Sequence, residues 1–135
     1  MAGLASARSG KTIIGVDDQP ENLAILEGLI ESRGYSFFGA ASGAECISLA
    51  LRVDPKLILL DVQMPVMDGY ETCRRLRAMF LLKTVPVAFL TARNGPEDVR
   101  EGLAAGGNDF IVKPFQTAQL LSRIKHWMDH RLPVA

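Results

Sequence analysis

The sequence predicts an α/β fold in which five parallel strands form one sheet with helices on both faces. Short apolar runs alternate along the chain with longer segments whose apolar residues recur at helical spacing. The clearest run, Leu57–Leu60, lies between Asp54-Pro55 and a loop rich in proline and glycine, which is typical of a strand buried on both faces. No repeat or low-complexity segment interrupts the alternation, which favours right-handed crossovers between parallel strands.

The first elements each have a local signal. Residues 12–16 form a β-rich run that stops at a pair of aspartates. Pro20 suits the first position of a helix with an apolar stripe, and we expect Gly34 to end that helix. Residues 35–41 form the second predicted strand.

The middle of the chain continues the alternation. Ser42 and Glu45 have the spacing of a capping box, which indicates the start of the next helix. After the strand at 57–60 we expect a helix over about 70–79. Residues 85–90 then form a fourth strand that ends at a threonine.

The last elements follow the same pattern. Pro96 and the two acids after it stand in the favoured places of a helix start. Residues 110–112 form the fifth strand. We expect Thr117 to cap the final helix, whose core face is formed by Leu120, Leu121, Ile124, Trp127 and Met128.

Length and composition limit the class of protein. The 135 residues make one domain, which we place at residues 11–131 after a flexible tail at 1–10. Fifteen basic and fifteen acidic residues cancel, so we expect no direct contact with nucleic acid or a membrane. No apolar run approaches the roughly 20 residues that span a bilayer. Cys46 and Cys73 lack metal-ligand spacing and are expected to be reduced, semi-buried thiols of a cytoplasmic protein.

Polar residues whose side chains could bind a ligand or take part in a reaction stand at the ends of four predicted strands. Asp17 and Asp18 follow the first strand, Asp61 the third, Thr91 the fourth and Lys113 the fifth. Each has an ordinary explanation by itself, because strands often end in a solvated polar residue. In an open α/β sheet, however, the carboxyl ends of the strands gather at one edge and form the ligand site. We therefore expect these five side chains to converge.

These groups suit Mg²⁺-dependent phosphoryl chemistry. Carboxylates held close together repel each other unless a cation lies between them, and Mg²⁺ prefers such oxygen ligands. Asp61 can then act as a nucleophile toward phosphorus. Lys113 supplies a positive charge, Thr91 supplies a hydroxyl donor, and the small Ala92 leaves room for the phosphodonor.

The same motifs resemble the receiver domain of two-component response regulators. They are the Asp17-Asp18 pair, Asp61 within the segment 61–69, Thr91-Ala92 and Lys113-Pro114-Phe115, separated by 43, 30 and 22 residues counted from Asp18. The resemblance covers about residues 11–131. It implies a flavodoxin-like three-layer sandwich with strand order 2-1-3-4-5, as in the chemotaxis receiver, flanked by five helices.

The resemblance also implies a role for each acid. Asp61 is the expected phosphoacceptor, and a histidine kinase or a histidine phosphotransfer protein is the expected donor. Asp18 binds Mg²⁺ directly, Asp17 binds it mainly through water, and the backbone carbonyl of Gln63 is a further ligand. Mn²⁺ is expected to serve in place of Mg²⁺.

The remaining roles concern switching. Lys113 pairs with the phosphoryl group, and the Lys113–Pro114 bond is expected to be cis, unlike about 95% of such bonds. Thr91 moves toward the phosphoryl oxygens, and the aromatic residue at 110 moves into the space left behind. Gln63 and Arg93 occupy positions that tune phosphoryl lifetime in relatives. Arg93 can either hold phosphate or obstruct water, and the sequence leaves both open.

Several positions depart from the pattern or carry a second interpretation. Phe110 stands where many relatives have tyrosine, so it can pack inward without a hydroxyl. Gly15 and Gly106-Gly107 put local stability in question. We expect Trp127 to pack against the domain. We also expect a solvated helix face formed by Arg74, Arg75 and Arg77.

The resemblance implies a regulatory module, not an enzyme with an external substrate, which catalyses only its own phosphorylation and dephosphorylation. Its partners are the phosphodonor and an output domain or downstream protein. The surface of the helix near Pro96, the strand 110–112 and the last helix is expected to report the state. Asp109 and Arg123 resemble a pair used there for dimerisation, so a homodimer is an open alternative.

Two further questions stay open. The chain ends soon after the last predicted helix, so it is either a stand-alone receiver or one excised from a larger regulator, such as a hybrid kinase or a cyclic-dinucleotide enzyme. The alternative from another class is a Mg²⁺-dependent phosphatase with an aspartyl nucleophile. Enzymes of the haloacid-dehalogenase type have an aspartate two residues after the nucleophile as general acid, and Gln63 stands there instead.

Overall fold

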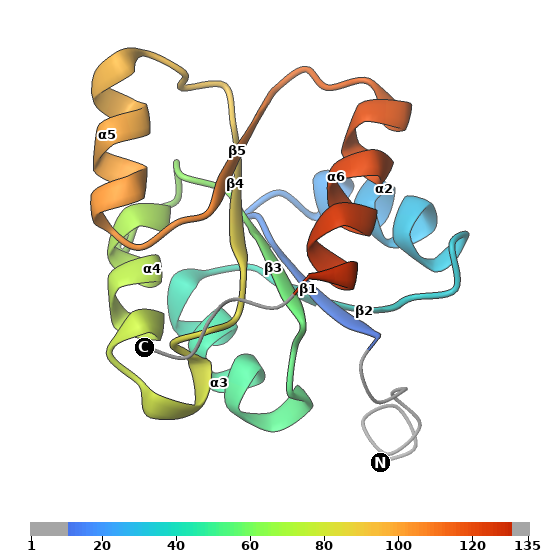
Figure 1. Ribbon diagram of the computed structural model, residues 1–135, viewed down its shortest axis with the longest axis horizontal. Coiled ribbons are helices and arrows are strands. Elements are labelled where there is room, and N and C mark those ends of the chain that lie inside the picture. Colours follow the sequence, from blue (N-terminus) through green and yellow to red (C-terminus); the bar gives the residue numbers. More distant parts are fainter. Residues whose placement is uncertain (1–10, 131–135) are drawn as a thin grey trace.

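A computed structural model describes residues 11–130 and shows one parallel sheet of five strands in the order β2-β1-β3-β4-β5 (Figure 1). The predicted fold class and the strand order that the resemblance implied are both confirmed. The expected tail at 1–10 and the last expected residue of the domain, 131, lie outside the described residues. The strands are β1 (Thr12–Val16), β2 (Ser36–Ala40), β3 (Leu57–Leu60), β4 (Val87–Thr91) and β5 (Asp109–Val112).

Helices cover both faces of the sheet. In the described region, α2 and α6 lie on one face and α3, α4 and α5 on the other (Figure 1). None of these helices is long and apolar enough to cross a membrane. Their bounds are α2 (Pro20–Glu31), α3 (Gly43–Val53), α4 (Gly69–Arg77), α5 (Pro96–Ala104) and α6 (Thr117–Asp129), with a short 3₁₀ helix, η1 (Phe80–Leu82), after α4.

The central strand β3 divides the apolar core into two halves. Successive side chains on a strand point to opposite faces. Accordingly, Ile58 and Leu60 pack under α3 and α4, whereas Leu57 and Leu59 pack under α2 and α6. All four are at most 1% exposed. This double burial explains why the run contains no polar residue and why the first charged side chain after it, Asp61, lies at the sheet edge.

Two predicted helix starts differ from the structure. Ser42 Oγ does accept the Glu45 amide N–H, but the Glu45 carboxylate accepts from Ala41 rather than from Ser42, so only half of the capping box forms. Thr117 is not a cap. Gln116 is the N-cap, with extended dihedrals and no capping side chain, and Thr117 is already the first helical residue. A hydroxyl within the helix cannot serve as the cap that precedes it.

Two glycines identified in the sequence have different explanations. A Cβ on Gly15 would lie 2.6 Å from the Phe37 ring, so the glycine makes room for an aromatic residue on the neighbouring strand β2. Gly106 has φ +104°, which L-residues rarely adopt, and it lies against the side chain of Arg77. The turn before β5 therefore depends on glycine for its conformation.

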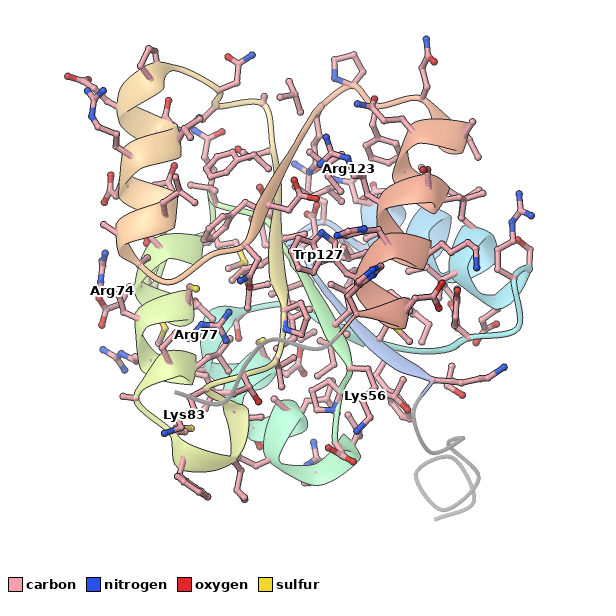
Figure 2. All side chains as sticks on the ribbon, in the orientation of Figure 1. Lys56, Arg74, Arg77, Lys83, Arg123 and Trp127 are labelled. Carbon is pink, nitrogen blue, oxygen red and sulfur yellow. The ribbon has the colours of Figure 1, made fainter. Side chains whose placement is uncertain are left out.

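The prediction of a solvated arginine face is wrong for Arg77. Arg74 and Arg75 pair with Glu71, and their side chains are 47% and 55% exposed. Arg77 instead points inward from α4 (Figure 2). Its guanidinium donates to the carbonyl oxygens of Gly106 (2.9 Å), Leu82 (3.2 Å) and Val85 (2.7 Å) and to Oδ1 of Asn108 (2.8 Å). One side chain thus joins α4, η1 and the turns that enter β4 and β5.

Replacing Arg77 with alanine is expected to lower the free energy of unfolding by about 3 kcal/mol, because several partly buried acceptors lose their donor together. Urea unfolding followed by circular dichroism measures this change. The matched control is Arg74→Ala, which removes an exposed ion pair worth less than about 1 kcal/mol. Equal effects of the two substitutions would contradict the assignment.

Candidate functional site

The sequence-predicted polar residues converge at the carboxyl edge of the sheet. Backbone hydrogen bonds extend the strand pairing just beyond the strand ends: the Asp61 amide donates to Val16 O (3.0 Å), and the Lys113 amide donates to Thr91 O (2.9 Å). The parallel register thus places the residue after β3 beside the end of β1 and the residue after β5 beside the end of β4, all at the same edge of the sheet. No interaction between the side chains themselves is needed for this placement.

Three carboxylates form the centre of the site. Asp17, Asp18 and Asp61 each place an oxygen so that the three oxygens lie within 4.8 Å of one another. Asp17 is 3% exposed, whereas Asp18 is exposed. Lys113 Nζ lies 3.1 Å from Asp17 Oδ2 and 3.8 Å from Asp61 Oδ2. An all-oxygen cluster of this kind fits a hard divalent cation.

The environment raises the pKa of Asp61. Desolvation by burial raises the pKa of its carboxyl above the ordinary value of 3.8, and the neighbouring Asp17 raises it further. The positive charge of Lys113 and the amides of Gln63 and Val62 oppose this shift without cancelling it. The acid cluster is therefore under repulsion that a bound cation would relieve.

The loop after Asp61 is packed directly against its backbone. The Gln63 amide donates to Asp61 Oδ1 (3.3 Å), and the Gly69 amide donates to Val62 O (2.8 Å). A Cβ on Gly69 would lie 2.3 Å from Asp61 O and 2.8 Å from Val62 Cα. Gly69 was not among the predicted site residues, although its place in the Asp68-Gly69 pair was a usable signal.

The residues at the end of β4 and just after it are held by contacts of their own. Thr91 is 1% exposed, and its Oγ1 accepts the Arg93 amide N–H (3.1 Å). Ala92 is exposed beside it. The Arg93 side chain pairs with Asp98 (2.8 Å) and lies over the Tyr70 ring, 5.9 Å from its centroid. Two roles were left open for Arg93, holding phosphate or obstructing water. It has neither role in this conformation, because its guanidinium pairs with Asp98 of α5.

Phe110 lies inward and half-buried. Its ring packs on Phe89 at a centroid distance of 5.1 Å. A Cβ on Gly102 would lie 2.4 Å from Phe110 Cε1, so a glycine on α5 opens the space that the ring occupies. Gly102 was not among the predicted site residues, and its local pattern does not identify it, because its partner Phe110 lies on another element, β5.

Asp109, Arg123 and Trp127 form a cluster within one chain. Arg123 pairs with Asp109 Oδ1, and the Trp127 indole N–H donates to Asp109 Oδ2 (2.8 Å). Figure 2 shows both α6 side chains on the side of the helix toward β5. Trp127 is half-buried against the α2–α6 core, as predicted.

The Lys113–Pro114 bond is cis, as the resemblance implied.

The fold and the acid cluster define a receiver domain of two-component signalling. The chain belongs to the response regulator receiver domain family, whose model matches residues 13–125. It is 39% identical over 123 residues to the transcriptional regulatory protein PrrA of Mycobacterium leprae, an alignment that covers 91% of this chain and 52% of PrrA. The chain thus spans about half the length of that relative.

Solved structures show the same fold. Chemotaxis protein CheY4 of Vibrio cholerae has a TM-score of 0.82 and 31% identity, covering 85% of this chain and 96% of CheY4. The receiver domain of the sensor histidine kinase PA1611 from Pseudomonas aeruginosa has a TM-score of 0.82 and 34% identity, covering 90% and 100%. That receiver has a magnesium ion coordinated in its active-site cleft.

Proposed function

We propose that the chain is a phosphorylation-controlled switch in which Asp61 accepts a phosphoryl group from the phosphohistidine of a histidine kinase or histidine phosphotransfer protein. The observation that carries the proposal is the placement of Asp61 beside two further carboxylates within 4.8 Å, with Lys113 Nζ at 3.8 Å. A carboxylate nucleophile needs positive charge around it to approach a phosphoryl group. Here Lys113 supplies one such charge, and the three carboxylates can bind a metal ion that supplies another.

In this proposal each site residue has a defined part in phosphoryl transfer. An Asp61 carboxylate oxygen bonds to phosphorus as the phosphorus–nitrogen bond of the donor breaks. Lys113 shifts from Asp17 toward the phosphoryl oxygens. The Thr91 hydroxyl, whose oxygen accepts the Arg93 amide N–H, turns to donate its proton to one of these oxygens. Phe110 is already inward, so its place over Gly102 supports the phosphorylated conformation. Ala92 leaves the approach open.

The cation that suits this site is Mg²⁺, with Mn²⁺ as a substitute, held by Asp17, Asp18, Asp61 and the Gln63 backbone carbonyl. It supplies positive charge that offsets repulsion among the acids and stabilises the charge of the transferring phosphoryl group. The magnesium ion seen in the PA1611 receiver and the acid cluster of this chain support the assignment.

In this proposal, phosphorylation changes the surface of the domain that partner proteins contact. We propose that the domain acts on no external substrate and catalyses only its own phosphorylation and dephosphorylation. The α5–β5–α6 surface then presents the state to an output domain or partner protein, or to a second copy of the chain, in the cytoplasm. The relation to PrrA, which is about twice as long, supports a place within a larger regulator as one of the two alternatives.

Treatment with a small phosphodonor tests the proposal. With Mg²⁺ present, intact-mass measurement is expected to show the gain of one phosphoryl group, and chelation of the metal is expected to prevent it. Sustained hydrolysis of a phosphate ester with no modified protein would instead favour the phosphatase. Gln63 argues against that alternative, because an amide two residues after Asp61 cannot act as general acid.

A further inference from the structure

We propose that Asn22 is a positioning residue that holds Asp17 ready for a divalent cation. This inference rests on the proposed function and concerns a residue outside the recognised motifs. Asn22 lies in the first turn of α2, and its side-chain amide donates to Asp17 Oδ2 at 3.0 Å. The sequence alone does not indicate this role, because an asparagine near a helix start usually hydrogen-bonds to the helix itself.

Asp17 is held by three donors. The Gln19 amide N–H donates to Oδ1 (2.9 Å), whereas Asn22 Nδ2 (3.0 Å) and Lys113 Nζ (3.1 Å) both lie on Oδ2. With its side chain only 4% exposed, the carboxylate has little water to replace a lost partner. Its orientation is therefore set by these three contacts.

The three donors differ in how permanent they are. The Gln19 contact comes from the backbone and does not depend on the side chain at that position. Lys113 is shared between Asp17 and Asp61, and its positive charge competes with a cation for the same acids. Asn22 is neutral and contacts only Asp17 among the three acids. It can therefore keep Oδ2 in place when Lys113 moves away.

Loss of Asn22 leaves Oδ2 held by Lys113 alone. The Gln19 amide still holds Oδ1, but Oδ2 can now move with the lysine, so the carboxylate is no longer oriented for a metal or a metal-bound water. Partners that orient metal-binding carboxylates typically contribute about 10-fold or more to metal affinity. We expect Asn22→Ala to raise the Kd for Mg²⁺ about 10-fold.

Calorimetric titration of the metal-free protein with MgCl₂ tests this value directly. The control is Gln119→Ala, which removes an exposed amide side chain at the same position of α6 as Asn22 has in α2, and its Kd is expected to stay within about twofold of wild type. Circular dichroism checks that both variants are folded. A purely structural role of Asn22 would change unfolding and leave the Kd unchanged.

A second measurement needs no variant. In ¹⁵N spectra of the wild-type protein, the Asn22 side-chain amide is expected to shift as Mg²⁺ is added, and to a greater extent than the Gln119 side-chain amide. Equal Mg²⁺ affinity of wild type and Asn22→Ala, or an Asn22 amide that does not respond, overturns this inference alone. Absence of Mg²⁺ binding by the wild-type protein overturns the proposed function together with it.

Discussion

Asp61→Asn is expected to abolish phosphorylation by a small phosphodonor, so that intact mass shows no gain where the wild-type chain gains one phosphoryl group. The amide that replaces the carboxylate is neutral and is a poor nucleophile toward phosphorus. Asp17 and Asp18 remain, but neither occupies the end of the central strand β3. The expected effect is therefore a complete loss of labelling.

The matched control for this experiment is Asp54→Asn. Asp54 follows α3 with a left-handed backbone (φ 52°), which asparagine tolerates, and its side chain is 82% exposed. This variant is expected to be labelled like wild type. Labelling that survives in Asp61→Asn, or disappears in Asp54→Asn, would contradict Asp61 as the phosphoacceptor.

Stability provides an independent check that Asp61→Asn is folded. Burial raises the pKa of the Asp61 carboxyl, so its ionised form destabilises the metal-free fold at neutral pH. Asp61→Asn is therefore expected to unfold at a higher temperature than wild type when no metal is bound. The penalty in wild type is fully present above the raised pKa, shrinks as pH falls through it, and is absent below 3.8, so the advantage should disappear there.

Gly69→Ala is expected to lower the free energy of unfolding by about 3 kcal/mol and to reduce phosphorylation of whatever protein stays folded. The new Cβ would meet Asp61 O, Asp61 C and Val62 Cα, which are backbone atoms and cannot rotate away. Relief requires the segment after β3 to shift, which costs folding energy and displaces the Asp61 side chain. Chemical denaturation and the labelling assay measure the two effects.

Gly28→Ala is the control for Gly69→Ala. Gly28 lies within α2, is exposed and has no atom within 4 Å of the position of an added Cβ. Alanine there is expected to raise stability by about 0.5–1 kcal/mol, since it lowers the entropy of the unfolded chain and favours helix. If both glycine substitutions destabilised the protein alike, the close approach at Gly69 would not be the cause.

The sheet and its polar edge were predictable from local patterns. The run Leu57–Leu60 is apolar because both of its faces are covered, and that requirement is visible in the residues themselves. Once strands and helices alternate, the polar residues that follow β1, β3, β4 and β5 must gather at one edge. Asp61 and Lys113 could be assigned to one site for this reason alone.

Contacts between distant segments were not predictable in the same way. Arg77 has the helical spacing of a solvated residue, yet its guanidinium bonds to carbonyls on either side of β4. Asn22 has the position of an ordinary first-turn residue, yet it orients Asp17. Neither role leaves a trace in the neighbouring sequence, because the partner lies on another element.

The amino-acid sequence by itself determined the alternation of strands and helices, the identity of the acids, threonine and lysine at the strand ends, and through them the receiver family. These properties depend on side-chain chemistry and on periodicity along the chain. Only the tertiary structure decided that Lys113 lies nearer Asp17 than Asp61, that Arg93 is engaged by Asp98, and that Gly69 touches the Asp61 backbone. Such choices depend on distances between elements, which packing sets and which no local pattern encodes.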